Sequence, residues 1–172
     1  MAAKKFLRYV NGVLNEVFGI QVSAGAGNAG DIVALDDQGR IDSSMMPIGY
    51  GSETKSIVAS EALAAGDFVN IYDNAGTPTV RKADASGGFA KRAMGFVIGA
   101  VANGANATVY YGNLNNQKSA LTPGARQYLS ATTPGATSDT PPSTAGHIVQ
   151  VLGNAVAATE ILVEIQEPIV LA

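Results

Sequence analysis

The sequence predicts an all-β fold: a compact β-sandwich or β-barrel domain of about eight short strands, preceded by an extended N-terminal arm with a possible β-hairpin. From residue 53 onward, short apolar runs alternate with turns built from Gly, Pro, Asn and Asp, a pattern typical of small all-β domains. Residues 1–52 lack the continuous apolar face of a domain that folds alone. We therefore expect an arm over 1–52 and a β-domain over 53–172.

The first segment of the arm supports two competing periodicities. Large apolar side chains recur every fourth residue, as on an amphipathic helix: Phe6, Val10, Leu14 and Phe18. Asn11-Gly12, which lies between two apolar runs, instead favours a type I′ hairpin. Glycine inside a helix costs about 1 kcal/mol, and Val and Tyr prefer strands. We therefore favour the hairpin and keep the helix as the alternative.

The remainder of the arm is rich in glycine and turn residues. We expect a flexible joint over 23–30, followed over 31–42 by a short strand, a turn on 37–39 and a second short strand. Residues 43–47 have room for one helical turn at most before Pro47. Because no part of the arm provides its own core, we expect the arm to pack on another protein.

The β-domain is expected to be a series of short strands separated by turns. The strands are predicted at 56–59, 68–72, 79–82, 93–101, 108–111, 127–130, 148–152 and 160–165. Within the domain, residues 62–66 are similar to residues 120–124, and each segment is followed by an apolar strand. Either this repeat is a chance match, or the domain consists of two similar β-units packed together.

Charged residues make up only 15% of the chain, whereas about 25% is usual in soluble proteins. Alanine, glycine and small polar residues take the places that Lys and Glu normally occupy. Such a surface is either poorly solvated or covered by a partner.

The composition argues against several classes of function. The formal charge is −3, which disfavours binding to nucleic acid or to an anionic membrane, because both require a positive field. The absence of cysteine removes disulfides, thiolate nucleophiles, zinc ribbons and iron–sulfur clusters. No apolar run approaches the ~20 residues that span a bilayer, and Arg8 and Asn11 interrupt any signal-peptide core. We expect a chain that is neither exported nor bound to a membrane.

Three patterns that could carry chemistry are better explained as structure. Residues 25–30 match G-x-G-x-x-G, but they lead into a strand-like run instead of the helix that a dinucleotide site requires. His147 is the only histidine, and no G-x-S-x-G elbow accompanies it. Acidic residues at 36–42 lack the order of a calcium loop, and those at 160–164 fit the exposed face of a strand. We expect no enzyme activity, no catalytic residue, no cofactor, no metal and no small-molecule substrate.

Several segments of the chain resemble virion proteins of tailed bacteriophages. Residues 30–47, GDIVALDDQGRIDSSMMP, resemble a segment found in both head decoration proteins and tail fibres. Three segments of the β-domain are similar to the β-domain of phage capsid decoration (cement) proteins: ASEALAAGDFVN at 59–70, LTPGARQYLS at 121–130 and GHIVQVLG at 146–153. The motifs consist of turn residues and small apolar residues, and together they cover most of the chain.

The resemblance implies a structural virion protein that binds the outer surface of the phage head and stabilises contacts between capsomers. Its partner would be the major capsid protein, its assembly a homotrimer, and its location the virion, after synthesis in the bacterial cytoplasm. The alternative is a tail-fibre or baseplate adaptor protein. An enzyme or a carbohydrate-binding module ranks lower, because the chain has no hydrolase motif and no tryptophan.

We assign capsid binding to the arm and oligomerisation to the β-domain. The residues expected to contact the capsid are the large apolar side chains of the arm: Phe6, Tyr9, Val13, Leu14, Val17, Ile32, Leu35, Ile41 and Met46.

Overall fold

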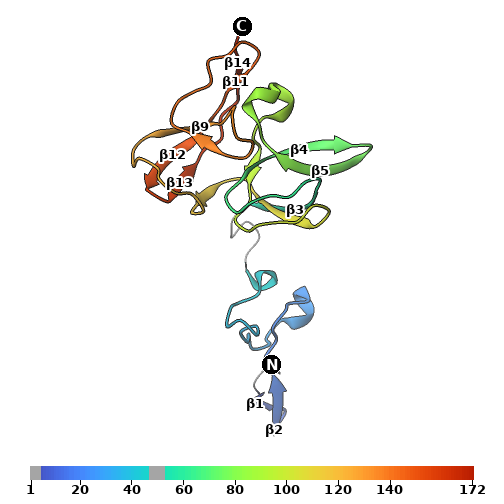
Figure 1. Ribbon diagram of the computed structural model, residues 1–172. Helices are drawn as coiled ribbons and strands as arrows, with labels where there is room; N and C mark the ends of the chain where they lie inside the picture. Colours follow the sequence, from blue (N-terminus) through green and yellow to red (C-terminus); the bar gives the residue numbers. More distant parts are fainter. Residues whose placement is uncertain (1–4, 47–52) are drawn as a thin grey trace. The chain divides into compact units, whose positions relative to one another are not determined.

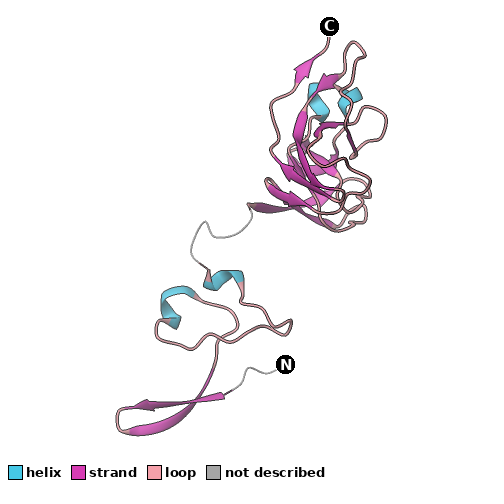
Figure 2. Cartoon of the chain, turned by 90° about the vertical axis from the view of Figure 1, so that its left-hand side faces the viewer, coloured by secondary structure: helices cyan, strands magenta, loops and turns pink. Residues whose placement is uncertain are grey.

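The structure, a computed structural model, describes residues 5–46 and 53–172. The chain divides into two compact parts, the arm over 1–51 and the β-domain over 52–172. In the described ranges the regular elements are β-strands and short 3-10 turns, which confirms the predicted all-β class (Figures 1 and 2). The boundary predicted between residues 52 and 53 borders a segment outside the described residues.

The arm begins with the predicted hairpin. Strand β1 (Lys5–Val10) pairs antiparallel with β2 (Val13–Phe18), with Lys5 opposite Phe18 and Val10 opposite Val13. The turn residues Asn11 and Gly12 have φ angles of 51° and 84°. Two successive positive φ angles define the type I′ turn, whose twist matches that of the paired strands. The hairpin prediction is confirmed, and the helical alternative is wrong.

The pair of short strands predicted over 31–42 is absent, although the turn on 37–39 is present. This segment makes a single parallel bridge, Ile20 to Val33, instead of a ladder. The Asp36 side chain accepts hydrogen bonds from the backbone N–H groups of Gln38 (2.9 Å) and Arg40 (2.8 Å). These bonds hold the chain in a turn, because a short acidic side chain competes with strand pairing for nearby backbone donors.

Two 3-10 turns complete the described arm. The first, η1 (Gly25–Asn28), occupies the glycine-rich stretch that the sequence suggested as a joint. Asn28 Oδ1 accepts a hydrogen bond from the Ala24 N–H at 2.6 Å and closes this turn. The second, η2 (Ser43–Met45), is the single helical turn expected before Pro47, which itself lies outside the described residues.

The first half of the β-domain is a closed barrel. Its strands are β3 (Thr54–Ala59), β4 (Phe68–Asn74), β5 (Thr77–Lys82), β6 (Gly95–Phe96) and β7 (Asn106–Tyr110), in the order β3-β5-β4-β6-β7. The pairs are antiparallel except for β3 with β5, which run parallel and close the barrel. The strand predicted over 93–101 is limited to the two residues of β6, because the chain turns away to the isolated bridge between Leu63 and Val101.

The second half is an open sheet of the same topology. Its strands are β8 (Asn113–Asn115), β9 (Arg126–Leu129), β10 (Thr137–Ser138), β12 (Val151–Ala157) and β13 (Glu160–Val163), in the order β10-β9-β12-β13-β8. A small ribbon of β11 (Ile148–Val149) and β14 (Ile169–Val170) stands apart from this sheet (Figure 1). The sequence did not predict β8, β10 or β14, and it merged β11 and β12 into one strand.

The two halves match strand for strand. The order β5-β4-β6-β7-β3 in the first half corresponds to β10-β9-β12-β13-β8 in the second. The similar segments that suggested a repeat make equivalent hydrogen bonds: the N–H of Gly66 donates to Val97 O, and the N–H of Gly124 donates to Ala155 O, both at 2.8 Å. The repeat is therefore structural, and the β-domain consists of two similar β-units.

The two units share one apolar cluster. Phe68 of β4 and Phe96 of β6 are opposite each other, fully buried, with ring centroids 6.0 Å apart. Around them pack buried side chains of the second unit, among them Leu129, Ile148, Leu152 and Ile161. A second cluster fills the closed barrel: Ile57, Ala59, Leu63, Val69, Val80, Val97, Ala107 and Val109. Burying one large apolar side chain contributes about 1.5–3 kcal/mol, so these clusters hold the β-domain together.

We predict that Gly153→Ala disrupts the second unit. Gly153 lies in β12 between β9 and β13, with a φ of 146°, and an added Cβ would overlap the carbonyl oxygen of Leu162. Backbone atoms of a paired strand cannot move aside cheaply, so the free energy of unfolding should fall by about 3 kcal/mol. Urea denaturation measures the change. Gly99→Ala is the matched control, because a Cβ there meets open space, and equal effects of the two substitutions would contradict the prediction.

Candidate functional site

The arm buries very little of its own apolar surface. Among the arm residues whose burial the structure describes, only Gly19 is fully buried. A Cβ on Gly19 would lie 2.8 Å from Ala34 Cβ and 3.1 Å from a ring carbon of Phe6, so glycine is required where these segments cross. Most of the large apolar side chains of the arm remain in solvent, as the sequence led us to expect.

The structure places the predicted contact residues on the surface, with one exception. Eight are exposed, with fractions between 37% for Phe6 and Met46 and 71% for Tyr9, while Val17 is half-buried. Exposure makes these side chains available to a partner; it does not by itself show that they bind one. Their use in capsid binding remains a prediction.

The hairpin separates these residues onto two faces. Cross-strand partners point to the same side of an antiparallel pair, so Tyr9 shares a face with Leu14, and Leu7 and Phe18 lie on that face too. We call Leu7, Tyr9, Leu14 and Phe18 the apolar hairpin face; their exposed fractions run from 58% to 71%. The opposite face carries Phe6, Val13 and Val17 with Arg8 and Asn15.

Leu7 and Phe18 are therefore candidate contacts that the sequence analysis missed. Their signal was present, because the Asn-Gly turn fixes the register and the register fixes which side chains share a face. The predicted set included Phe6 instead, which belongs to the more buried face.

The Lys5–Glu16 ion pair lies on the apolar hairpin face itself, because Lys5 is opposite Phe18 and Glu16 is opposite Leu7. Lys5 Nζ lies 2.7 Å from Glu16 Oε2 and 5.2 Å from the centre of the Phe18 ring. On the other face, Arg8 lies 3.9 Å from the Asp31 carboxylate and joins the hairpin to the following loop. Exposed ion pairs of this kind contribute at most about 1 kcal/mol, so they orient the hairpin more than they stabilise it.

The β-domain has exposed apolar side chains on its second unit. Leu114 of β8 faces Leu162 of β13, and each is 41% exposed. Val156 of β12 is 49% exposed, and Ile169 and Val170 of β14 are 69% and 53% exposed. The sequence analysis named none of them as contacts: Leu162 lies in the strand predicted over 160–165, and the others lie in strands that were missed or merged. Of these, Leu114 and Leu162 form an exposed apolar pair across β8 and β13.

A cleft of about 450 Å³ opens in the second unit. It lies between the chain after β8 and the short strand β10, and it is lined by residues 117–122 and 136–139 and by Gln127. Hydroxyl and amide groups predominate in this lining. We call it the second-unit cleft.

Lys118 is the one residue of this cleft whose ionisation is clearly perturbed. Its side chain is half-buried, with Nζ 5.1 Å from the centre of the Phe68 ring. Burial lowers the pKa of Lys118 to about 8, and the nearby carboxylate of Asp67 opposes this shift. The ammonium group therefore destabilises the folded protein at neutral pH, because burial penalises its charge.

The acidic groups of the arm serve its turns. Backbone hydrogen bonds, led by that from Arg40, hold the pKa of Asp36 below its ordinary value, and hydrogen bonds from Ser44 do the same for Asp42.

The described residues show no grouping typical of a metal site. Within 5–46 and 53–172, no three His, Cys, Asp or Glu side chains lie close enough together to hold a metal ion. In these same ranges no helix is long and apolar enough to cross a membrane. His147 lines a shallow hollow of about 280 Å³ beside Pro141 and Pro142.

Comparison with known proteins identifies no relative: no protein-family model, no curated protein and no solved structure matches the chain. A proposal about function therefore depends on the chain's own surfaces and on the segment resemblances given above.

We predict that Lys118→Met changes how stability depends on pH. The pKa of Lys118 is about 8 in the folded protein, against about 10.4 in an unfolded chain. Between these values the folded state binds fewer protons than the unfolded state, so the stability of the native sequence rises with pH across this window. Lys118→Met should lack that contribution and be more stable at pH 7 by on the order of 2 kcal/mol.

Urea denaturation from pH 7 to 10.5 measures this difference, which should disappear near the upper limit. Lys55→Met, at an exposed position of β3, is the matched control and should follow the native pH dependence. Parallel stability curves for Lys118→Met and the native chain would show that Lys118 is not penalised by burial.

Proposed function

We propose that this chain is a non-enzymatic capsid decoration protein, which binds the outer surface of a phage head and stabilises contacts between capsomers. The major capsid protein is its proposed partner and the virion its proposed location. One observation carries the proposal: the arm presents large apolar side chains on an ordered hairpin and provides no core to bury them.

The apolar hairpin face has the composition of a protein contact. Interfaces are enriched in aromatic residues, and this face combines Tyr9 and Phe18 with Leu7 and Leu14. Its two charged residues, Lys5 and Glu16, form an ion pair with each other. A protein surface is the expected partner, because the hairpin's cations are few and one of them, Lys5, is paired with Glu16. The outer edges of β1 and β2 also have free backbone groups that a partner strand can pair with.

The low charge of the whole chain favours burial on several sides. Only 15% of its residues are charged, so few ions must leave water when the surface is covered. A decoration protein meets neighbouring capsomers at many equivalent positions, and repetition converts modest single contacts into firm attachment. The resemblance of 30–47 and of the β-domain segments to virion proteins points to a phage capsid as the surface in question.

For the β-domain we propose self-association as a homotrimer. Leu114, Leu162 and Val156 provide exposed apolar area on the second unit, where copies of the chain can meet. The solution mass of the purified full chain tests this assignment: a stable trimer is expected, and a monomer at micromolar concentration would contradict it.

We predict that the double substitution Leu7→Ser and Phe18→Ser weakens capsid binding by about thirtyfold or more. Each substitution removes an exposed apolar anchor, and interface anchors contribute more than about 1 kcal/mol each. Because both side chains face solvent, the hairpin itself should remain folded. Cosedimentation of the full chain with capsids that lack it measures the affinity.

Val22→Ser is the matched control, since Val22 is similarly exposed, at 65%, but lies outside the hairpin and is not among the expected contacts. It should bind nearly as tightly as the native chain. Equal losses in both variants would show that the apolar hairpin face is not the contact. Electron microscopy of the labelled chain on whole particles separates the alternatives, because attachment to the tail instead of the head would replace this proposal with a tail adaptor.

A further inference from the structure

The second-unit cleft lies where the two halves of the β-domain differ. In the first unit, β3 and β5 pair in parallel, with Val58 opposite Thr79 and Ala59 opposite Val80, and this pair closes the barrel. The equivalent strands of the second unit, β8 and β10, do not pair, and its five strands form an open sheet. The cleft occupies this seam, between residues 117–122 on one side and 136–139 on the other.

The side chains at the seam differ in polarity between the units. Val69 of β4 is opposite Gly95, and the equivalent pair in the second unit is Gln127 opposite Gly153. Two residues further along each strand, Ile71 is opposite Val80, whereas Leu129 is opposite Thr137. Val69 and Val80 belong to the apolar filling of the closed barrel. In the open sheet of the second unit, Gln127 and Thr137 occupy the matching positions, and both line the cleft.

Gln127 is exceptional among the buried polar residues. It is 2% exposed, yet its side-chain amide has no hydrogen-bond partner among the described residues. Every side-chain polar atom of the buried described residues either has a partner or is in contact with solvent. The Gln127 amide must therefore open into the cleft that it lines. Because this amide bonds to no group of the protein, its donor and acceptor atoms are available to a bound molecule at the base of the cleft.

The other buried side-chain amides are satisfied within the protein. Gln150 accepts from the Ala93 N–H at 2.7 Å and donates to Ala93 O at 2.9 Å, and Asn115 donates to Gly66 O at 3.0 Å.

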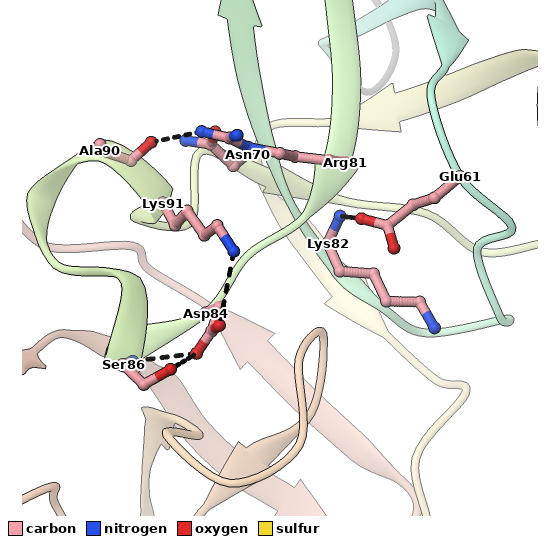
Figure 3. A network of polar contacts seen from close by, with 8 residues as sticks. All are labelled: Glu61, Asn70, Arg81, Lys82, Asp84, Ser86, Ala90 and Lys91. Carbon is pink, nitrogen blue, oxygen red and sulfur yellow. Dashed lines mark hydrogen bonds and ion pairs between the residues drawn. The ribbon is translucent and has the colours of Figure 1, made fainter.

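In the first unit, too, the buried polar side chains have hydrogen-bond partners within the protein. Asn70 donates to Arg92 O at 2.9 Å and accepts from the Arg81 guanidinium at 3.0 Å. Figure 3 shows Asn70 and Arg81 side by side, and Asp84 bonded to Ser86 and paired with Lys91. Gln127 differs from these residues, because its amide has no partner in the protein and opens into the cleft.

We propose that the second-unit cleft is a peptide-binding site, which takes an extended polypeptide segment as an added strand beside β10. An added strand would complete the barrel at the seam where β8 and β10 do not meet. Strand addition provides affinity through backbone hydrogen bonds, while alternate side chains enter the groove and determine specificity.

The lining favours a peptide over other ligands of similar size. A volume of about 450 Å³ lies in the range of about 300–1,000 Å³ for binding clefts. The lining contains no aromatic ring on which a sugar could stack. Its hydroxyls and amides, from Ser119, Thr122, Gln127, Thr137 and Ser138, both donate and accept hydrogen bonds. Leu121 and the oppositely charged Lys118 and Asp139 also line the cleft, so the lining has no net charge with which to select a charged ligand. The hydroxyls and amides match a backbone together with small hydroxyl or amide side chains, and we assign the site to a segment rich in Ser, Thr, Asn and Gln.

Affinity selection by the full chain from two libraries of blocked heptapeptides tests this site. One library contains only Gly, Ala, Ser, Thr, Asn and Gln, and the other only Leu, Ile, Phe, Lys and Glu. Enriched peptides should come from the first library, and their dissociation constants are then measured by calorimetry. Their binding should slow amide hydrogen exchange at 136–139 and 117–122 and leave exchange in the closed barrel unchanged.

Gln127→Val is the decisive variant, because it places in the cleft the residue that the closed barrel carries at Val69. It should weaken binding of the selected peptides at least tenfold, and its thermal midpoint should be at least that of the native chain. Asn103→Val, at an exposed loop position, is the matched control and should bind like the native chain.

Three outcomes would overturn the proposal. The first is enrichment from neither library. The second is tight peptide binding that Gln127→Val leaves unchanged. The third is saturable binding of a mixture of neutral disaccharides, abolished by Gln127→Val, without any peptide binding; this would make the cleft a carbohydrate site. None of these results depends on capsid binding by the arm, so the peptide site and the proposed function succeed or fail separately.

Discussion

The apolar cluster around Phe68 and Phe96 is the constraint on which the β-domain depends. Both rings lie on the outer side of the closed barrel, where Leu129, Leu152 and Ile161 of the second unit cover them. The first unit needs this cover, because two fully buried phenylalanines on its outside would otherwise face water. The same contact buries Leu129, Leu152 and Ile161 of the second unit. Each half is thus stabilised by its partner half, and the seam of the second unit does not have to close for the domain to be stable.

The two units of the β-domain share one topology and differ at the seam of the second unit, and this difference bears on function. The turns at Gly66 and Gly124, the strand order and the glycines opposite Val69 and Gln127 are all shared. What changes is the seam, where a parallel strand pair and valines give way to a cleft lined by amides and hydroxyls. Gln127 is 98% covered. If packing alone determined this position, an apolar side chain such as Val69 of the first unit would serve better, because it removes no polar group from water. The polar seam therefore indicates a use that packing does not explain.

Sequence reasoning was reliable where local chemistry determines structure. Asn11-Gly12 predicted the hairpin because a type I′ turn needs two positive φ angles, which these residues tolerate best. It failed where the structure of a segment is determined by a side-chain hydrogen bond or by contact with a distant segment. Asp36 turned 36–40 away from strand pairing through its own hydrogen bonds, and β8 and β10 are too short to show alternation. The cleft was out of reach for the same reason: it depends on which strand edges fail to meet, and that is settled by tertiary packing.

The two surfaces proposed to bind partners differ in how much of the binding cost is met in advance. A two-stranded hairpin is marginally stable in water, so an apolar face carried on β1 and β2 loses part of its contact energy to fixing the hairpin against its partner. The second-unit cleft is framed by strands of a domain with two buried clusters, and the Gln127 amide is already in place. A peptide there encounters a preformed site, so few protein groups must be ordered on binding. The arm therefore depends on repetition over a symmetric surface to hold firmly, whereas a single cleft can select one segment by its side chains.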